Sequence, residues 1–243
     1  MGKIDLRKSS GFPIFLEDDA LVSDSLTYLK SEVCNVGKIK HQLLNPDITN
    51  PELFSITYSN LDQDEVFSNK GIRLDLTVVF PNLAGIEYLK SYSTVSHTRN
   101  RIIEILYGGG TIVAQSFENV DEGDIIYSNL KKGQKIIIPK GYEMSISNTK
   151  STQLVYIQLI DKKSSIENCL DDMGGMSYYV IRKNAKQEIV RNPQYRQAGT
   201  PRKINFEKII SSWNITSKTP IIKQILRKYE KFSWFFSNNS ITI

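Results

Sequence analysis

Histidine and cysteine are the scarce residues of this sequence, with only two of each in 243 residues. Cys34 and Cys169 lie far apart and lack the C-x-x-C spacing of zinc and redox sites, so the sequence indicates neither a disulfide framework nor a zinc ribbon. With only His41 and His97, the chain is unable to assemble a site of three imidazole ligands.

Long apolar runs are missing as well. No stretch of 18 apolar residues occurs, and the N-terminal residues have no apolar segment of signal-peptide length. These absences exclude a transmembrane helix and lead us to expect a cytoplasmic protein. At 40% hydrophobic residues, the chain has enough apolar side chains to bury a sizeable core.

What the sequence does contain is a series of strand patterns. Between about residues 53 and 159, short runs of β-branched and aromatic residues alternate with turn residues, and Ile72, Leu74, Leu76 and Val78 repeat with the two-residue period of a strand that buries one face. About nine such runs predict an all-β sandwich or barrel. The glycines at 108–110 predict a hairpin turn.

Both ends of the chain differ from this pattern. Residues 1–52 are mixed and predict a segment that wraps the sheet, with a short helix over Ser23–Val33. Residues 201–243 contain eight basic and two acidic residues, a net charge of +6 against −1 for the rest of the chain. Apolar residues from Ile221 to Phe232 recur with helical spacing, and Thr219 followed by Pro220 predicts the start of a helix. We expect three parts: 1–52, a barrel over 53–200, and a helical extension over 201–243.

Basic and aromatic residues of the extension are candidates for binding a partner. The basic residues lie at helical spacings near aromatic ones, and the candidate set comprises Lys223, Arg227, Lys228, Lys231 and Trp234. Such a helix could grip phosphates and stack on unpaired bases, could dock on a membrane surface, or could bury its apolar face on the barrel or across a homodimer. Nucleic acid, a ribonucleoprotein and a protein remain alternative partners.

A motif in the barrel region carries a family resemblance. In "KKGQKIIIPKGYEMSISNT" (residues 131–149), Gly133, Pro139, Gly141 and Asn148 follow the pattern G-x5-P-x-G-x2-H-x3-N, the second conserved motif of cupins, except that Met144 stands at the histidine. Residues 73–116 and the later "MGGMSYYVIRKN" and "RNPQYR" are similar to segments of cupin-type glucose-6-phosphate isomerases. This resemblance implies a cupin jelly-roll barrel, a homodimer and an archaeal or bacterial source.

The resemblance also implies a metal site whose ligands have been replaced here. Metal cupins hold Fe, Mn, Zn or Ni with three histidines and a glutamate inside the barrel. The matching positions are Thr94, Ser96, Arg101 and Met144, and a shift of one residue would instead place His97 at a ligand position. A guanidinium repels a cation and is unable to ligate one, so with these replacements the resemblance implies no bound metal and no cofactor. Glu104 lies three positions after Arg101, and Glu143 lies next to Met144. Both separations are odd, so we expect both glutamates to face away from the site.

Three functions follow as hypotheses. The first is a metal-free, catalytically inactive cupin, with no catalytic or metal-binding residues, that binds or scaffolds a partner through its extension. The second is a sugar-phosphate isomerase or epimerase with a rearranged pocket. The third is a sensor in which Arg101 holds a small anionic ligand inside the barrel, where Thr94, Ser96, His97 and Met144 also lie.

Overall fold

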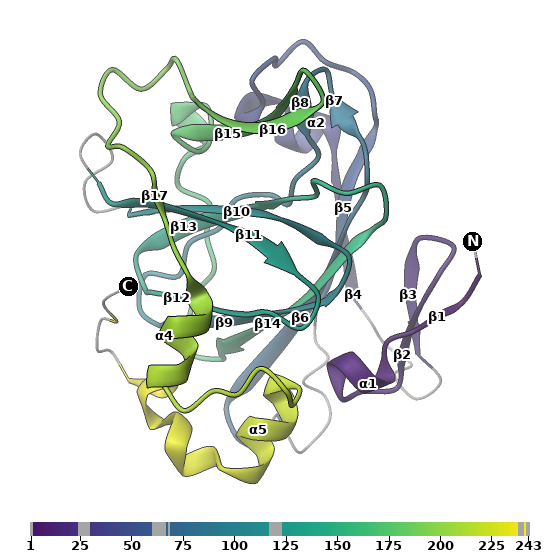
Figure 1. Cartoon of the computed structure of the whole chain (residues 1–243), viewed down its shortest axis with the longest axis vertical. Coiled ribbons are helices and arrows are strands. Elements are labelled where there is room, and N and C mark those ends of the chain that lie inside the picture. The colour runs from purple at the N-terminus through teal and green to yellow at the C-terminus, as the bar shows by residue number, and fades with distance from the viewer. Residues whose placement is uncertain are drawn as a thin grey trace.

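Two largely antiparallel sheets stacked face to face form the centre of the molecule, with a further layer on each side (Figure 1). The computed structural model describes residues 2–23, 30–59, 67, 69–116, 123–237 and 241. Among these residues, the jelly-roll barrel implied by the sequence is confirmed. A large apolar cluster that includes Ile103, Ile105, Ile112 and Ile146 fills the space between the two central sheets.

The larger central sheet has six strands, in the spatial order β12-β9-β14-β6-β5-β4. Their bounds are β4 (Lys30–Asn35), β5 (Leu53–Ser59), β6 (Ile72–Val79), β9 (Arg101–Tyr107), β12 (Lys135–Ile138) and β14 (Leu154–Asp161). The helix predicted over Ser23–Val33 is wrong from residue 30 onwards, because this part pairs with β5 as a strand; residues 24–29 lie outside the described part of the chain. Strand β4 thus extends a sheet that we expected to begin at residue 53.

The second central sheet has the order β13-β10-β11-β17. Its members are β10 (Gly109–Ser116), β11 (Ile125–Lys131), β13 (Tyr142–Ser147) and β17 (Arg202–Lys203). The hairpin predicted at the glycines is wrong, because β9 and β10 belong to different sheets and the chain turns a corner between them at Gly108. Gly108 has a φ of +70°, and a Cβ there would lie 2.2 Å from the carbonyl oxygen of Gln153, so only glycine suits this corner.

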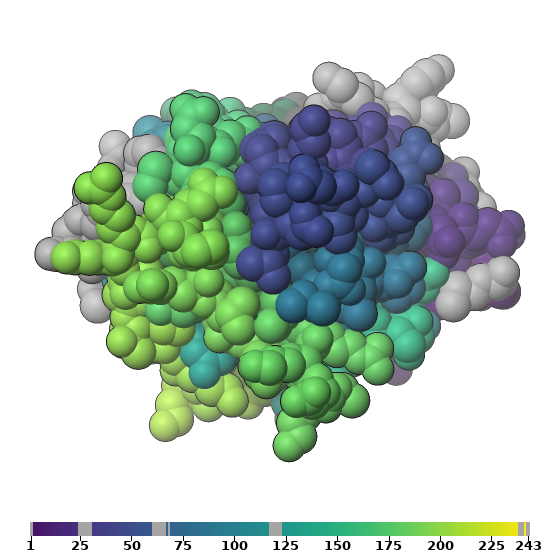
Figure 2. Space-filling model, turned by 90° about the horizontal axis from the view of Figure 1, so that it is seen from above, coloured from purple at the N-terminus to yellow at the C-terminus, as the bar shows by residue number. Residues whose placement is uncertain are grey.

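A third sheet covers the outer face of β10 and β11 (Figure 1). Its strands, in the order β16-β15-β8-β7, are β7 (Leu83–Ala84), β8 (Glu87–Tyr88), β15 (Tyr178–Lys183) and β16 (Lys186–Arg191), of which β16 had no counterpart in our expectation. Figure 2 shows this end of the molecule, where residues 30–55 (dark blue) lie beside residues 160–200 (green). Two short helices, α2 (Val36–Ile39) and η1 (Lys40–Gln42), face η3 (Asp171–Met173) here, and the side-chain amide of Gln42 donates to Asp171 at 2.6 Å.

The outer face of the six-stranded sheet is covered by both ends of the chain. At the N-terminal end this cover consists of β1 (Ile4–Asp5), α1 (Arg7–Ser10), β2 (Ile14–Glu17) and β3 (Ala20–Ser23), and at the C-terminal end of α4 (Phe206–Ser212), α5 (Ile221–Arg227) and η4 (Tyr229–Phe236). The apolar positions of β6 face this cover, whereas the alternate positions Arg73, Asp75 and Thr77 face inwards. Strand β6 therefore buries both faces, where the sequence predicted only one.

The single helix predicted after Pro220 is in fact two segments. Helix α5 ends at Arg227, and Lys228, with φ −140° and ψ +48°, breaks the chain before the 3₁₀-helix η4 begins. The cap predicted at Thr219 is also wrong: helix α5 starts at Ile221, and its first amide donates to a carboxylate oxygen of Glu104 on β9, at 2.6 Å. The helix start is thus stabilised by the sheet beneath it.

A buried ion pair lies at this contact. Lys135 Nζ is 2.8 Å from Glu104 Oε1, and the two side chains are 0% and 5% exposed. Lys135 also donates to the carbonyl oxygen of Ser217 at 3.2 Å, so this pair connects β9 and β12 to the extension. No helix among the described residues is long and apolar enough to cross a membrane.

Candidate functional site

Three of the residues predicted to replace the metal ligands come together inside the barrel. Thr94 and Met144 form an isolated antiparallel bridge, in which Thr94 N donates to Met144 O at 3.1 Å and Met144 N donates to Thr94 O at 2.9 Å. Arg101, at the start of β9, reaches this bridge and donates from Nη1 to Thr94 Oγ1 and from Nη2 to Thr94 O, both at 2.9 Å. A further bond runs from Nη2 to Tyr142 O at 2.8 Å.

The Arg101 guanidinium is completely buried and is bonded only to uncharged oxygens within the described part of the chain. Its Nε has no hydrogen-bond partner there. Burial lowers the pKa of Arg101 to about 10, against an attractive contribution from Glu143, so the side chain keeps its positive charge at neutral pH. A positive charge thus lies in the position that the resemblance assigns to a metal ligand, beside a thioether and a hydroxyl.

Ser96 and His97 are not part of this group. Ser96 Oγ lies 2.5 Å from Ser164 Oγ and donates to the carbonyl oxygen of Arg99, so it holds a loop together. The His97 side chain is at the surface, 35% exposed, and approaches Glu167. The shift of one residue that would place His97 inside the barrel does not occur, because Thr94 keeps the bridge to Met144.

A polar cavity of about 120 Å³ opens beside Thr94 and Met144. Its walls come from β4, β5, β6 and β14 and from the segment around Tyr92, and Arg101 is not among the lining residues. Sequence reasoning missed most of this lining. The available signal was the polar half of the β6 alternation, Arg73, Asp75 and Thr77, which lies between the apolar positions that we took to be the buried face.

The charges of the cavity are largely neutralised by one another. Arg73 and Asp75 form a two-pronged ion pair with distances of 3.1 Å (Nε to Oδ1) and 2.6 Å (Nη2 to Oδ2). Lys38 pairs with Glu32 and also lies over the ring of Tyr92, 4.8 Å from its centroid. Such a lining offers many donors and acceptors with little net charge, which suits an uncharged polar ligand better than a dianion.

Neither of the two glutamates on the metal-site strands faces the cavity, as their parity predicted. Glu104 lies on the outer face of β9, and Glu143 accepts hydrogen bonds from Ser93 Oγ at 2.6 Å and from the amide of Cys169 at 3.2 Å. Burial raises the pKa of the Glu143 carboxyl above its usual range, against the hydrogen bond from Ser93. The Tyr92 hydroxyl donates to Asp171 at 2.5 Å, and burial followed by this contact raises the Tyr92 pKa. A general base in the cavity would have to be one of the paired carboxylates, Asp75 or Glu32.

The residues predicted to bind a partner divide into two groups. The four cations Lys223, Arg227, Lys228 and Lys231 are exposed. Trp234 instead packs within the apolar cover, with its ring centroid 4.8 Å from that of Trp213. Trp234 is therefore unsuited to stacking on an unpaired base without local rearrangement, whereas the four cations are accessible.

Residues 52–197 match the family described as Glucose-6-phosphate isomerase (GPI). Among solved structures, the chain is similar to the vicilin from Solanum melongena (11% identity, TM-score 0.39, 48% of this chain and 31% of that chain), and to the vicilin from Corylus avellana (11%, 0.39, 49% and 33%). It is also similar to oxalate decarboxylase from Bacillus subtilis (13%, 0.39, 49% and 29%). The chain thus spans about a third of the length of each of these proteins.

No curated protein matches this chain. The family match covers more than half of the chain, and it includes β5 to β16 with Thr94, Arg101 and Met144. The protein belongs to the glucose-6-phosphate isomerase family, in its cupin-type branch.

Proposed function

We propose that this chain is a binding member of its family that has lost isomerase catalysis. One observation carries the proposal: the buried guanidinium of Arg101, which the resemblance aligns with the ligand glutamate, bonds to Thr94, which it aligns with a ligand histidine. Together with Met144, these residues do not fit the metal that the family implies, because a guanidinium, a hydroxyl and a thioether are unsuited to hold it. Any chemistry in the cavity therefore has to come from the side chains of this chain.

The remaining groups of the cavity offer little for the chemistry of an isomerase. Moving a proton between C1 and C2 of a sugar phosphate needs a positioned base and a group that stabilises the enediolate. Asp75 and Glu32 are each held in an ion pair, and Arg101 has its Nη donors turned to the backbone and Thr94. This arrangement also speaks against Arg101 as an anion clamp. The cavity instead suits a small, uncharged polar ligand such as a free sugar.

A coupled assay with fructose 6-phosphate tests the loss of catalysis. We expect no turnover above background with or without added Fe²⁺ or Mn²⁺, in the wild type and in the Asp75→Asn variant. Metal-stimulated turnover by the wild type would overturn the proposal. Ligand binding is tested separately, by thermal shift with free sugars and sugar phosphates, and we expect a shift with free sugars that Thr57→Val and Gln158→Leu in the cavity wall diminish.

A second candidate, a sugar-phosphate isomerase or epimerase with a rearranged pocket, is favoured by one feature, the carboxylate of Asp75 in the cavity wall. In this alternative Asp75 is the base and Arg73 or Lys38 stabilises the developing charge. The same assay separates the two: turnover that Asp75→Asn lowers by about 100-fold or more, the usual range for a general base, would establish the second candidate.

We further propose that the exposed cations of the extension bind an anionic partner in the cell, with nucleic acid or a ribonucleoprotein as the first choice. Replacement of Lys223, Arg227, Lys228 and Lys231 by glutamine is expected to weaken RNA binding and to reduce its salt dependence. The matched control replaces four exposed cations on the opposite layer, Arg182, Lys183, Lys186 and Arg191. Equal losses of RNA affinity in both variants would indicate non-specific attraction. No loss of RNA affinity in the glutamine variant of the extension would refute the proposed surface.

A further inference from the structure

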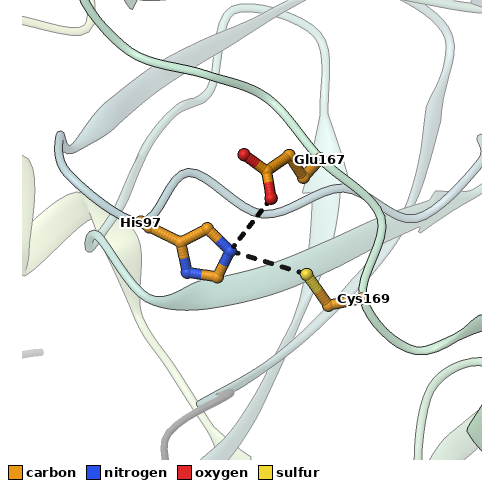
Figure 3. Close-up of side chains that lie close together, drawn as sticks. All are labelled: His97, Glu167 and Cys169. Atoms are coloured by element: carbon orange, nitrogen blue, oxygen red, sulfur yellow. Dashed lines mark hydrogen bonds and ion pairs between the residues drawn. The ribbon is translucent and has the colours of Figure 1, made fainter.

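Three side chains of metal-binding type converge at the surface, outside the barrel. His97 Nε2 lies 3.5 Å from Cys169 Sγ and 3.7 Å from Glu167 Oε2. One ligand atom from each residue lies within 4.8 Å of both others. Figure 3 shows the imidazole beside the thiol and the carboxylate, with its Nε2 turned towards both.

The backbone explains why residues about 70 positions apart meet here. Val95 and Glu167 form an antiparallel bridge with two hydrogen bonds, Val95 N to Glu167 O at 2.8 Å and Glu167 N to Val95 O at 3.1 Å. The bridge places Glu167 beside the segment that leads into His97. Because the two chains are antiparallel, His97 and Cys169 leave the bridge in opposite directions. The chain bends at residues 97–99, and the His97 ring reaches Cys169 across the bridge.

This face is separate from the cavity. Ile166 lines the cavity, but its neighbour Glu167 does not. The side chains of His97 and Glu167 are 35% and 54% exposed, so an ion could enter from solution without opening the barrel. The cluster is also distinct from Arg101 and Met144, whose side chains are completely or almost completely buried.

The loop that supplies Glu167 and Cys169 is fixed by buried polar contacts. The amide of Cys169 donates to Glu143 Oε2 at 3.2 Å, and the Asn168 side-chain amide donates to the carbonyl oxygen of Ser93 at 2.9 Å and to Ser93 Oγ at 2.8 Å. Glu143 and Ser93 are both fully buried. A site held in this way needs little rearrangement to accept a ligand, and its ligands are oriented by a surrounding shell.

We propose that His97, Glu167 and Cys169 bind a divalent transition-metal ion of the zinc type. An imidazole nitrogen, a thiolate sulfur and a carboxylate oxygen are the donors that zinc combines, and a thiolate disfavours Mg²⁺ and Ca²⁺. With Zn–N near 2.0 Å and Zn–S near 2.3 Å, tetrahedral geometry places the nitrogen and sulfur about 3.5 Å apart. The distance between His97 Nε2 and Cys169 Sγ is 3.5 Å. On binding, the thiol proton passes to solvent, and water takes the fourth position.

Cobalt titration of the purified full chain tests this proposal, because Co²⁺ replaces Zn²⁺ and a cobalt–thiolate bond gives a charge-transfer absorption. We expect one equivalent of Co²⁺ to produce this band and an equivalent of Zn²⁺ to displace it. His97→Ala and Glu167→Gln are each expected to weaken binding by more than about tenfold, and Cys169→Ser to abolish the band.

The chain supplies its own controls, because it contains one other cysteine and one other histidine. Cys34 is buried and His41 contacts Asp171, so Cys34→Ser and His41→Ala are expected to retain both the band and the affinity. The rise in melting temperature on adding Zn²⁺ should likewise be retained in Cys34→Ser and His41→Ala and lost in Cys169→Ser. The absence of a band with the wild type, or its loss in Cys34→Ser rather than Cys169→Ser, would overturn the proposal. Because this site lies outside the barrel, zinc content alone does not test the loss of isomerase activity, and the two proposals fail independently.

Discussion

At the scale of single residues, the site is defined by the positive charge of Arg101, which has no countercharge in contact with it in the described part of the chain. Arg101 satisfies its Nη donors with Thr94 and a backbone carbonyl, and the nearest electrostatic attraction comes from Glu143, which is committed to Ser93 and Cys169. Hydrogen bonds to a charged donor are worth more than neutral ones, since loss of the acceptor leaves a buried charge poorly solvated. Thr94 is therefore expected to matter more for stability than its size suggests.

Replacement of Thr94 by valine tests this expectation. Valine keeps the volume and the backbone bridge but removes Oγ1, so we expect a loss of about 1.5–3 kcal/mol in the free energy of unfolding, measured with urea. Thr111→Val is the control, because Thr111 is also buried but bonds to the neutral Asn129 at 3.1 Å. It should cost about 1 kcal/mol. If Thr111→Val proves the more costly of the two, the Arg101 contact contributes less than we infer.

The parity of residues along β9 and β13 was accessible from the sequence, whereas contacts between distant segments were not. Arg101 and Glu104 are separated by three positions, and the strand period alone placed them on opposite faces. The convergence of His97 with Glu167 and Cys169 depends on the bridge between Val95 and residue 167, for which no local pattern exists. The inward direction of Arg73 and Asp75 was missed because the apolar positions of β6 were as suitable for the inner face as for the outer one.

At the scale of elements, the extension is fixed to the barrel by polar contacts beneath its apolar cover. The buried pair of Glu104 and Lys135 bonds to the start of α5 and to the carbonyl oxygen of Ser217. Breaking one side of such a pair leaves an uncompensated charge, but replacing both sides with apolar residues is often close to neutral. Single and double variants at Glu104 and Lys135 are therefore expected to differ markedly in their free energy of unfolding.

We expect Glu104→Gln to lower the free energy of unfolding by about 3–5 kcal/mol, since Lys135 then lacks its countercharge. The double variant Glu104→Leu with Lys135→Met is expected to recover most of this loss. Denaturant unfolding measures the stability, and limited proteolysis after residue 204 measures the release of the extension. A double variant as unstable as the single one would show that the pair contributes through its hydrogen bonds to α5 rather than through charge.

The strand β17 is attached to β11 by a more accessible pair, which predicts a dependence on pH. Hydrogen bonds from Arg202, and to a lesser extent from Tyr142, hold the pKa of the Asp124 carboxyl below its usual value. A carboxyl with a depressed pKa in the folded state stabilises the fold above its unfolded pKa of about 3.9 and loses this contribution as the pH falls through the folded value. Since Arg202 is half exposed, the contribution is about 1 kcal/mol or less.

Asp124→Asn is accordingly expected to be less stable than the wild type at pH 7 and to equal it at pH values well below about 4, the unfolded pKa of the carboxyl. Thermal unfolding across this pH range measures the difference. Asp47→Asn serves as the control, because Asp47 is exposed, and it should be close to the wild type throughout. A difference between Asp124→Asn and the wild type that persists unchanged in acid would assign the effect to packing instead of ionisation.

At the scale of the whole molecule, the extension was predicted to pack on the barrel or to remain available to a partner, and the structure combines the two. Its apolar side joins the cluster that covers β6, β9 and β14, while its cations remain exposed. The sequence indicated most strands of the barrel and the cupin jelly-roll fold, because these depend on local period and on motif spacing. It was unable to indicate which sheet face receives the extension. We propose that residues 1–52, 53–200 and 201–243 form one folding unit.

Removal of the extension is therefore expected to disrupt the protein. A chain that ends at Pro201 would expose Ile102, Ile137 and Ile157 and would leave Lys135 and Glu104 without the contacts of α5. We expect poor solubility and no cooperative thermal transition by circular dichroism. The glutamine variant of the four exposed cations should melt within a few degrees of the wild type. A well-folded, soluble truncated chain would show that the cover is dispensable.

The position of this cover in the sequence has a consequence for biosynthesis. Residues 204–236 are translated after every strand that they protect. A nascent chain in which β6, β9 and β14 have already paired would present the apolar outer face of that sheet to solvent until α4, α5 and η4 leave the ribosome. Chaperones that recognise exposed apolar surface should accordingly act on this protein after the strands of the barrel have been made and before α4, α5 and η4 cover them.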